Sequence, residues 1–243
     1  MKKLILLVCL ALVGCKEAPS NTAASLPEEP PVQAPIIAPI VTPPVSKIYI
    51  FGDEISAGDG VTNPYWKELE TASGKSIENR SYSNATGGIF FGAGGVSTMN
   101  TTLDLNNNNL GGIGPSDIII IFVGYTDVRW YGNVGGNFSS FFTPFINAAY
   151  NTGAQIYIVS PIKMNAGVYN SFSPLNNGSD SGMATFSGLL QNAANGFNSS
   201  GVVYVDMINQ FNPVAQNLQA NLQYPNDTGH LVIASVLKTA MGL

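Results

Sequence analysis

Acidic side chains and the single histidine of this 243-residue sequence stand in short polar blocks beside apolar segments. Asp53 and Glu54 directly follow the apolar residues 47–52, and Asp227 lies three positions before His230. An imidazole changes its charge near neutral pH and can exchange protons with its neighbours, which is the chemistry of general acid–base catalysis. These four side chains are therefore the first candidates for a functional site.

The segments around these blocks alternate between predicted strands and predicted helices. Apolar runs predict strands over residues 47–52, 77–83, 117–123, 155–160 and 202–206. Helices are predicted over residues 64–72, 138–151, 183–197 and 229–241. This alternation predicts one α/β domain over residues 47–243, with a doubly wound, mostly parallel sheet between two helical layers. Functional groups of such sheets lie outside the carboxyl ends of the strands, where Asp53 and Glu54 fall.

Four blocks resemble, in order, the motifs of the SGNH/GDSL hydrolases, a family of esterases and lipases. They are residues 52–58 (GDEISAG) for the GDSL block, residues 79–87 for the block with the oxyanion-hole glycine, residues 124–127 (GYTD) for the GxND block, and residues 227–230 (DTGH) for the DxxH block. The resemblance implies the flavodoxin-like, three-layer SGNH fold. It also implies a pocket that includes Asp53, Gly124, Tyr125 and Trp130.

The sequence departs from the family pattern at the positions that carry the chemistry. Glu54 stands where the family has its nucleophilic serine, and Asn84 and Thr126 stand at the two oxyanion-hole positions. Only the Asp227–His230 pair is retained. Loss of a catalytic serine costs about 10⁶ in kcat, and loss of one oxyanion donor costs about 10²–10³. A carboxylate would also repel the developing oxyanion, so ordinary serine-esterase catalysis is not expected.

Several uses of the altered site stay open from sequence alone. The first is a pseudoenzyme that serves as a binding or structural module, in which Glu54 favours the imidazolium form of His230. The alternative is an active hydrolase of esters or acetylated glycans, in which Glu54 activates water with the help of His230 and Asp227. A third interpretation is a surface protein that only kept the scaffold. Ser56, two residues beyond Glu54, is interpreted as a turn or cap residue.

Ligands and cofactors are only weakly indicated. Asp53, Glu54, Asp227 and His230 have the side-chain types of a metal site, but their spacing matches no dedicated metal motif, so neither a metal nor another cofactor is expected. A glycan or a small ester is the expected ligand. Aromatic residues at positions 125, 130 and 131 could stack on a sugar at the pocket rim, or they could pack in the core.

The first fourteen residues predict a lipoprotein signal peptide. Lys2 and Lys3 precede an apolar run over residues 4–13, which is too short for the ~20 residues that cross a bilayer. Residues 12–15 (LVGC) resemble the lipobox, which implies cleavage before Cys15 and lipidation of its sulfur. Lys16 does not resemble an inner-membrane retention signal, so the outer membrane is expected if the cell is Gram-negative.

Residues 15–46 are rich in Pro and Ala, which predicts an extended, lipidated tether. The cysteines at positions 9 and 15 are the only two, so no disulfide is expected. The chain carries 10 basic and 15 acidic side chains, a net charge of −5 that becomes −7 without Lys2 and Lys3. This negative balance does not predict a basic surface of the kind that binds nucleic acid. The sequence does not indicate an oligomeric state.

The lipobox predicts that Cys15→Ser releases the protein from the membrane fraction or stalls its processing. The reason is that each buried CH₂ of an acyl chain contributes about 0.8 kcal/mol to anchoring, and the serine variant carries no acyl chain. Labelling with radioactive palmitate, followed by membrane fractionation, measures this directly. Equal incorporation into the wild type and the variant would exclude Cys15 as the anchor.

Overall fold

The computed structural model describes residues 46–81, 110–125, 128, 135–163, 165, 180–197, 201–221 and 223–243. The chain divides into residues 1–42 and residues 43–243, and every described residue belongs to the second unit. The predicted signal peptide, Cys15 and the tether up to residue 45 lie outside the described residues. None of the helices within these ranges is long and apolar enough to cross a membrane.

Five parallel strands form one sheet in the order β2-β1-β3-β4-β5. The strands are β1 (Lys47–Gly52), β2 (Ser76–Asn79), β3 (Ile118–Phe122), β4 (Gln155–Val159) and β5 (Val202–Val205). Four of the five residues of the central strand β3 are buried, as expected for an apolar run covered on both faces. The predicted doubly wound parallel sheet is confirmed.

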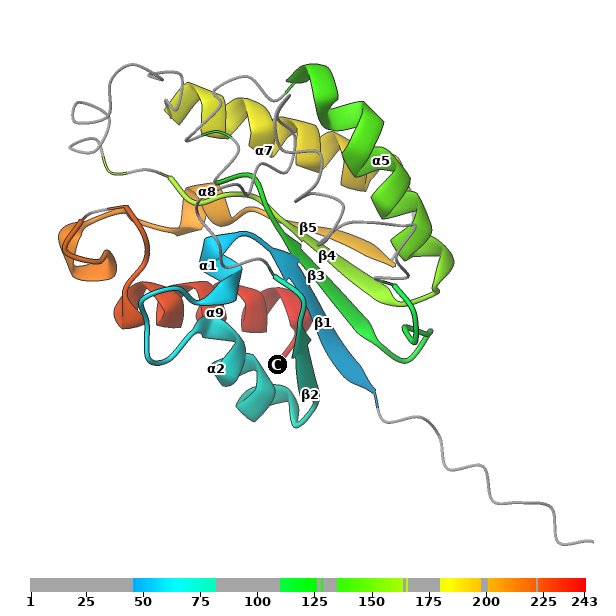
Figure 1. Cartoon of the computed structure of the whole chain (residues 1–243), viewed down its shortest axis with the longest axis horizontal. Coiled ribbons are helices and arrows are strands. Elements are labelled where there is room, and N and C mark those ends of the chain that lie inside the picture. The colour runs from blue at the N-terminus through cyan, green and yellow to red at the C-terminus, as the bar shows by residue number, and fades with distance from the viewer. Residues whose placement is uncertain are drawn as a thin grey trace, which may run out of the picture. The chain divides into compact units, whose positions relative to one another are not determined.

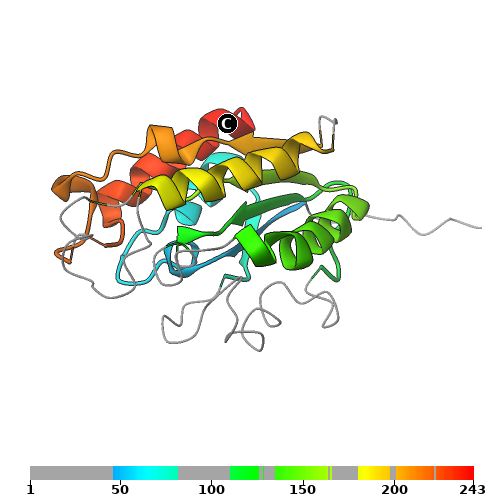
Figure 2. The ribbon, with the colours of Figure 1, turned by 90° about the horizontal axis from the view of Figure 1, so that it is seen from above.

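Helices cover both faces of the sheet. The longer ones are α2 (Tyr65–Ser73), α5 (Gly135–Asn151), α7 (Asp180–Asn195) and α9 (Asp227–Met241). Figure 1 shows α2 and α9 on one side of the sheet and α5 and α7 on the other, and Figure 2 gives the same layers from above. Three short elements complete the described fold: α1 (Glu54–Ala57), α8 (Met207–Gln210) and the 3₁₀ turn η2 (Ala215–Asn217).

Two boundaries differ from the sequence predictions for physical reasons. The second strand was predicted over residues 77–83, but β2 ends at Asn79 because it is an edge strand whose residues are only partly buried. Helix α1 was not predicted, because a four-residue helix shows no periodicity. Its signal is the cap: the Asp53 carboxylate accepts a hydrogen bond from the backbone N–H of Ile55 at 3.2 Å.

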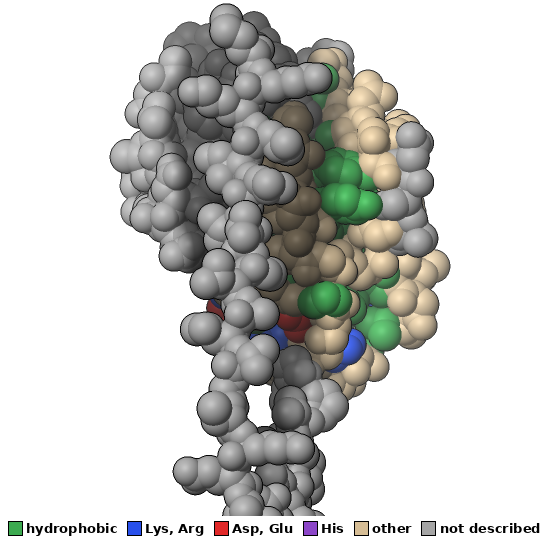
Figure 3. All heavy atoms as spheres, turned by 90° about the vertical axis from the view of Figure 1, so that its right-hand side faces the viewer, with side chains coloured by type: hydrophobic (Ala, Val, Ile, Leu, Met, Phe, Trp, Pro, Cys, Tyr) green, Lys and Arg blue, Asp and Glu red, His purple; other side chains and the backbone are tan. Residues whose placement is uncertain are grey.

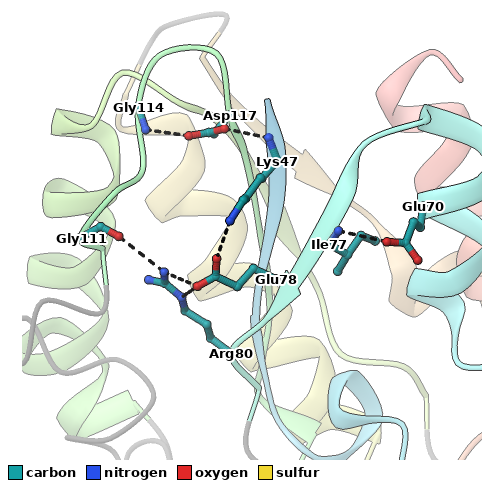
Figure 4. Close-up of polar contacts among 8 residues, drawn as sticks. All are labelled: Lys47, Glu70, Ile77, Glu78, Arg80, Gly111, Gly114 and Asp117. Atoms are coloured by element: carbon teal, nitrogen blue, oxygen red, sulfur yellow. Dashed lines mark hydrogen bonds and ion pairs between the residues drawn. The ribbon is translucent and has the colours of Figure 1, made fainter. Parts of the chain in front are cut away.

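The amino-terminal edge of the sheet is closed by polar contacts. Asp117 is 7% exposed, and its carboxylate accepts hydrogen bonds from the backbone N–H groups of Lys47 and Gly114, both at 2.8 Å. Beside it, Glu78 pairs with the side chains of Lys47 and Arg80 (Figure 4). The ion pairs are half-exposed and contribute little to stability, whereas the buried Asp117 ties β1 to the turn before β3. The candidate site described below lies at the opposite edge, at the carboxyl ends of the strands.

Uncharged groups cover much of the described surface. In Figure 3, charged side chains are few and gather near the lower edge of the visible face, while the rest is hydrophobic or uncharged polar. This agrees with a sequence in which only 10% of residues are charged.

The turn after β3 requires a glycine. Gly124 has φ +106°, and a Cβ there would lie 2.0 Å from the ring of Phe186 on α7. Both the backbone conformation and the space therefore exclude a side chain. Helix α7 can approach the end of β3 only because position 124 carries no side chain.

Gly124→Ala should lower the free energy of unfolding by about 3 kcal/mol or more, because backbone strain adds to the overlap with Phe186. Gly74→Ala is the matched control, since Gly74 also has a positive φ, of 65°, but its Cβ would meet nothing within 4 Å. It should cost about 1 kcal/mol. Urea unfolding of both variants measures the difference. Equal costs would mean that the contact with Phe186 does not constrain position 124.

Candidate functional site

The predicted site lies where the strand order changes direction. The chain passes from β1 to β2 on one side of β1, and β3 then lies on its other side. In doubly wound sheets of this order, ligands bind outside the carboxyl ends of the strands at such a switch point. Asp53 and Glu54 follow β1 directly, and Gly124 and Tyr125 follow β3.

Asp53 joins the first and third sequence blocks. It is 3% exposed, and one carboxylate oxygen caps α1. The other oxygen accepts a hydrogen bond from the backbone N–H of Tyr125 at 3.1 Å. Both oxygens thus bind backbone amides of the turns that close β1 and β3. Asp53 is a positioning residue for the floor of the switch point.

Glu54 is the first residue of α1 and is 3% exposed. The N-terminal turn of a helix favours a negative side chain, which is consistent with an acidic residue at this position. A general base for water must meet solvent and substrate, whereas a structural carboxylate can be buried. The burial of Glu54 therefore favours a structural role.

Ser56 is a buried packing residue of α1. Its Oγ donates a hydrogen bond to the carbonyl of Phe122 at 3.4 Å and accepts one from the phenol of Tyr65 at 3.0 Å. Burial raises the pKa of Tyr65, so its hydroxyl stays protonated and remains a donor. Ser56 is fully buried, and its hydroxyl is not presented to solvent as a nucleophile.

His230 is packed against the start of α2. Its ring is 1% exposed and stacks on the ring of Tyr65, with centroids 5.9 Å apart and planes at 7°. Its Nδ1 accepts a hydrogen bond from the backbone N–H of Tyr65 at 3.2 Å. The first amides of a helix lack partners within the helix, and the N-cap residue Pro64 makes no side-chain cap. His230 therefore acts as the cap of α2.

Asp227 binds the chain just before α2. Its Oδ1 accepts hydrogen bonds from the backbone N–H groups of Thr62 and Asn63, both at 2.9 Å. Within the described part of the chain, no hydrogen bond or ion pair joins Asp227 to His230. The two retained residues of the fourth block hold the entry to α2, and they do not form the hydrogen-bonded pair of a catalytic triad.

The hydrogen bond at Nδ1 fixes the proton of His230. Because Nδ1 accepts, the neutral ring carries its proton on Nε2. A triad needs the opposite tautomer, with Nδ1–H held by the aspartate and Nε2 free to accept a proton. Burial lowers the pKa of His230 to about 4, although the charge of Asp227 raises it in part. The imidazolium form of His230 is therefore disfavoured, because burial lowers the pKa by more than the charge of Asp227 raises it.

The expected pocket residues have different outcomes. Gly124 stands at the end of β3 as described above. Tyr125 is 1% exposed, its hydroxyl donates a hydrogen bond to the carbonyl of Gln223, and its ring lies 5.9 Å from that of Tyr224. It is a core residue, so of the two alternatives left open by the sequence, packing in the core is the one that holds for Tyr125. Four further expected residues lie outside the described residues: Asn84, Thr126, Trp130 and Tyr131.

The metal alternative finds no geometric support. Over the described ranges, no group of three or more His, Cys, Asp or Glu side chains is placed to hold a metal ion. The reason is visible in the hydrogen bonds: Asp53 binds amides near β1 and β3, whereas Asp227 binds amides before α2.

Sequence reasoning missed Tyr65, which contacts both Ser56 and His230 and so connects the first and fourth blocks. Its position directly after Pro64 marks a helix start. That signal indicates a helix whose first amides need acceptors, but it does not name the side chain that supplies them.

A comparison of the sequence with protein-family models and with curated proteins finds no match. Solved structures do match. A member of the lipolytic protein G-D-S-L family from Veillonella parvula has a TM-score of 0.60 at 16% identity, over 82% of this chain and 100% of that chain. The lipase/acylhydrolase from Enterococcus faecalis has 0.56 at 14%, over 81% and 95%. An acetyl xylan esterase has 0.57 at 16%, over 80% and 98%.

These likenesses show that the protein has the α/β fold of the SGNH/GDSL lipases and acylhydrolases. They cover 80 to 82% of this chain. At identities of 14 to 16% they carry the fold and not the activity.

The buried neutral His230 predicts a loss of stability in mild acid. Its folded-state pKa of about 4 lies below the unfolded value of 6.5, so the unfolded chain binds the proton first as the pH falls. The full contribution is present above about pH 6.5, and about 3 kcal/mol is lost by about pH 4. His230→Asn shares every carboxylate with the wild type, so the difference between their pH profiles isolates this loss.

The single histidine also permits a direct measurement by NMR. The Hε1 signal of His230 should stay constant from pH 8 to 5 in the folded protein and shift only below that range. A titration midpoint at or above 6.5 would contradict the buried neutral ring.

Proposed function

We propose that the protein is a lipid-anchored, non-hydrolytic member of the SGNH/GDSL fold class, in which the former catalytic site serves as a structural lock and the domain as a binding module. The contact between His230 Nδ1 and the backbone N–H of Tyr65 carries this proposal. It engages the nitrogen that a triad aspartate would have to hold. It also leaves the proton on the nitrogen that would have to accept one.

The nucleophile position supports the same conclusion. Glu54 stands where the family resemblance places the serine, and its side chain is buried. A carboxylate could attack an ester only by forming an anhydride, which would need hydrolysis in turn. The next hydroxyl along the chain, that of Ser56, is engaged by Phe122 and Tyr65. No described side chain of this block is presented as an activated nucleophile.

Anchoring belongs to the same proposal. The LVGC sequence that ends at Cys15 resembles a lipobox, and the Pro- and Ala-rich residues that follow would hold the domain away from the membrane. In a Gram-negative cell, Lys16 favours the outer membrane. The partners of such a module are the membrane, through the lipid, and a ligand of the cell envelope such as a glycan.

Turnover assays test the absence of hydrolysis. The purified full-length chain should release no acetate above background from acetylated glycans and no p-nitrophenol from p-nitrophenyl acetate. An active esterase of the same fold serves as the positive control. The expectation follows from the loss of the serine, which alone costs about 10⁶ in kcat.

Glu54→Gln, His230→Ala and the exposed-site control Glu70→Gln extend the assay. Turnover in the wild type that persists in Glu70→Gln but disappears in both of the other variants would overturn the proposal. It would instead establish the alternative in which Glu54 and His230 activate water. Turnover that survives all three changes and co-purifies with the chain would also overturn the proposal, because it would show hydrolysis that does not use Glu54 or His230.

A further inference from the structure

A cleft opens outside the carboxyl ends of β4 and β5, and residues of α7 and the short helix α8 help to line it. Figure 1 shows where these two helices lie in the fold. Its volume is about 470 Å³. The residues that line it come from four segments: Lys163 after β4; Ala184, Ser187, Gly188 and Gln191 on α7; Tyr204 and Asp206 at the end of β5; and Ile208 and Asn209 on α8. None of these residues belongs to the four sequence blocks.

Helix α7 lines one side of the cleft with mostly small side chains. Its four lining residues follow the spacing i, i+3, i+4, i+7, so they share one face of the helix. Three of them are small, and a Cβ built on Gly188 would meet no atom of the described residues within 4 Å. Among these residues, no neighbouring side chain fills the space beside Gly188.

Hydroxyl groups lie against one another in this lining. Ser187 is 5% exposed, and its Oγ is hydrogen-bonded to the hydroxyl of Tyr204 at 2.5 Å. A hydroxyl has one donor and two acceptor sites, so this pair keeps capacity for a ligand. Tyr204 is half-buried and brings an aromatic ring to the same surface, which can pack against the apolar face of a ligand.

The opposite side of the cleft holds an oriented carboxylate. The side-chain amide of Asn209 donates to both oxygens of Asp206, at 3.1 and 2.9 Å. This fixes the carboxylate and leaves the amide oxygen of Asn209 as a further acceptor. Lys163 and Gln191 add donors at the margins of the cleft. Donors and acceptors thus converge on one small volume, which is the usual composition of a small-molecule site.

The charges of the lining decide the class of ligand. It contains one cation, Lys163, and one anion, Asp206, and so has no net formal charge. A ligand with a single charge would leave one of these groups facing a like charge. A neutral ligand with many hydroxyls needs no compensating charge, and each of its hydroxyls can donate to one group and accept from the next.

We infer that this cleft binds a neutral saccharide of one or two rings. The inference deepens the proposed function, since it gives the binding module a site and a ligand class. The two fail separately: ester turnover would overturn the proposed function alone, and the absence of saccharide binding would overturn this inference alone.

Titration followed by NMR tests it. The labelled full-length chain, in a detergent without a sugar headgroup, is titrated with maltose, xylobiose and N,N′-diacetylchitobiose, and separately with inorganic phosphate and the zwitterion glycylglycine. At least one saccharide should shift the amides of Gly188, Gln191 and Asp206, with a dissociation constant of about 1 mM. Shifts from none of the three sugars, or from phosphate or glycylglycine alone, would overturn the inference.

Gly188→Phe provides the structural control. A phenyl group there fills the cleft, and replacing a helical glycine favours the helix, so the thermal midpoint should be unchanged or higher. Saccharide binding should weaken about tenfold or more. Asn192→Phe, at an exposed position of α7 outside the lining, should bind as the wild type does. Unchanged binding in a folded Gly188→Phe variant would show that the sugar binds elsewhere.

Discussion

The first backbone amides of a helix need acceptors outside the helix, and at the entry to α2 they are bound by side chains from the other end of the sequence. Pro64 supplies no side-chain cap. The amides before and after it instead bind Asp227 and His230, which come from the first turn of α9. These contacts hold two helices together on one face of the sheet. An unsatisfied buried amide such as that of Tyr65 costs about 1–3 kcal/mol, so His230 has a structural reason to persist without any catalytic one.

The same principle accounts for Asp53. Its two oxygens accept hydrogen bonds from backbone amides of the turns after β1 and β3. This carboxylate therefore connects the two turns at the switch point. Asp53 is thus committed to the backbone and is not available to bind a substrate.

The parallel sheet was predictable because it depends on the alternation of apolar strands and helices, a pattern spread over many residues. The order of the strands was not predicted. The apolar run of β3, for example, suits only a strand covered on both faces. The roles of the polar residues were less accessible. An aspartate three positions before a histidine indicates that the two residues are close. It does not indicate whether they bind each other or a third group, because that depends on the position of Tyr65, which is distant in the sequence. The position of Tyr125 was left open for a similar reason: an aromatic residue after a strand packs inward or outward according to neighbours such as Tyr224.

The close approach of α7 to the end of β3 also constrains how this sequence can drift. The ring of Phe186 occupies the space where a side chain at position 124 would stand. A smaller residue at 186 would relieve the overlap, but the left-handed backbone at 124 would still disfavour any replacement there. Substitutions at the two positions are therefore unequal: Phe186 can shrink while Gly124 stays, whereas Gly124 cannot change first. Among homologues of this chain, the glycine at position 124 should be conserved more strictly than the phenylalanine at position 186.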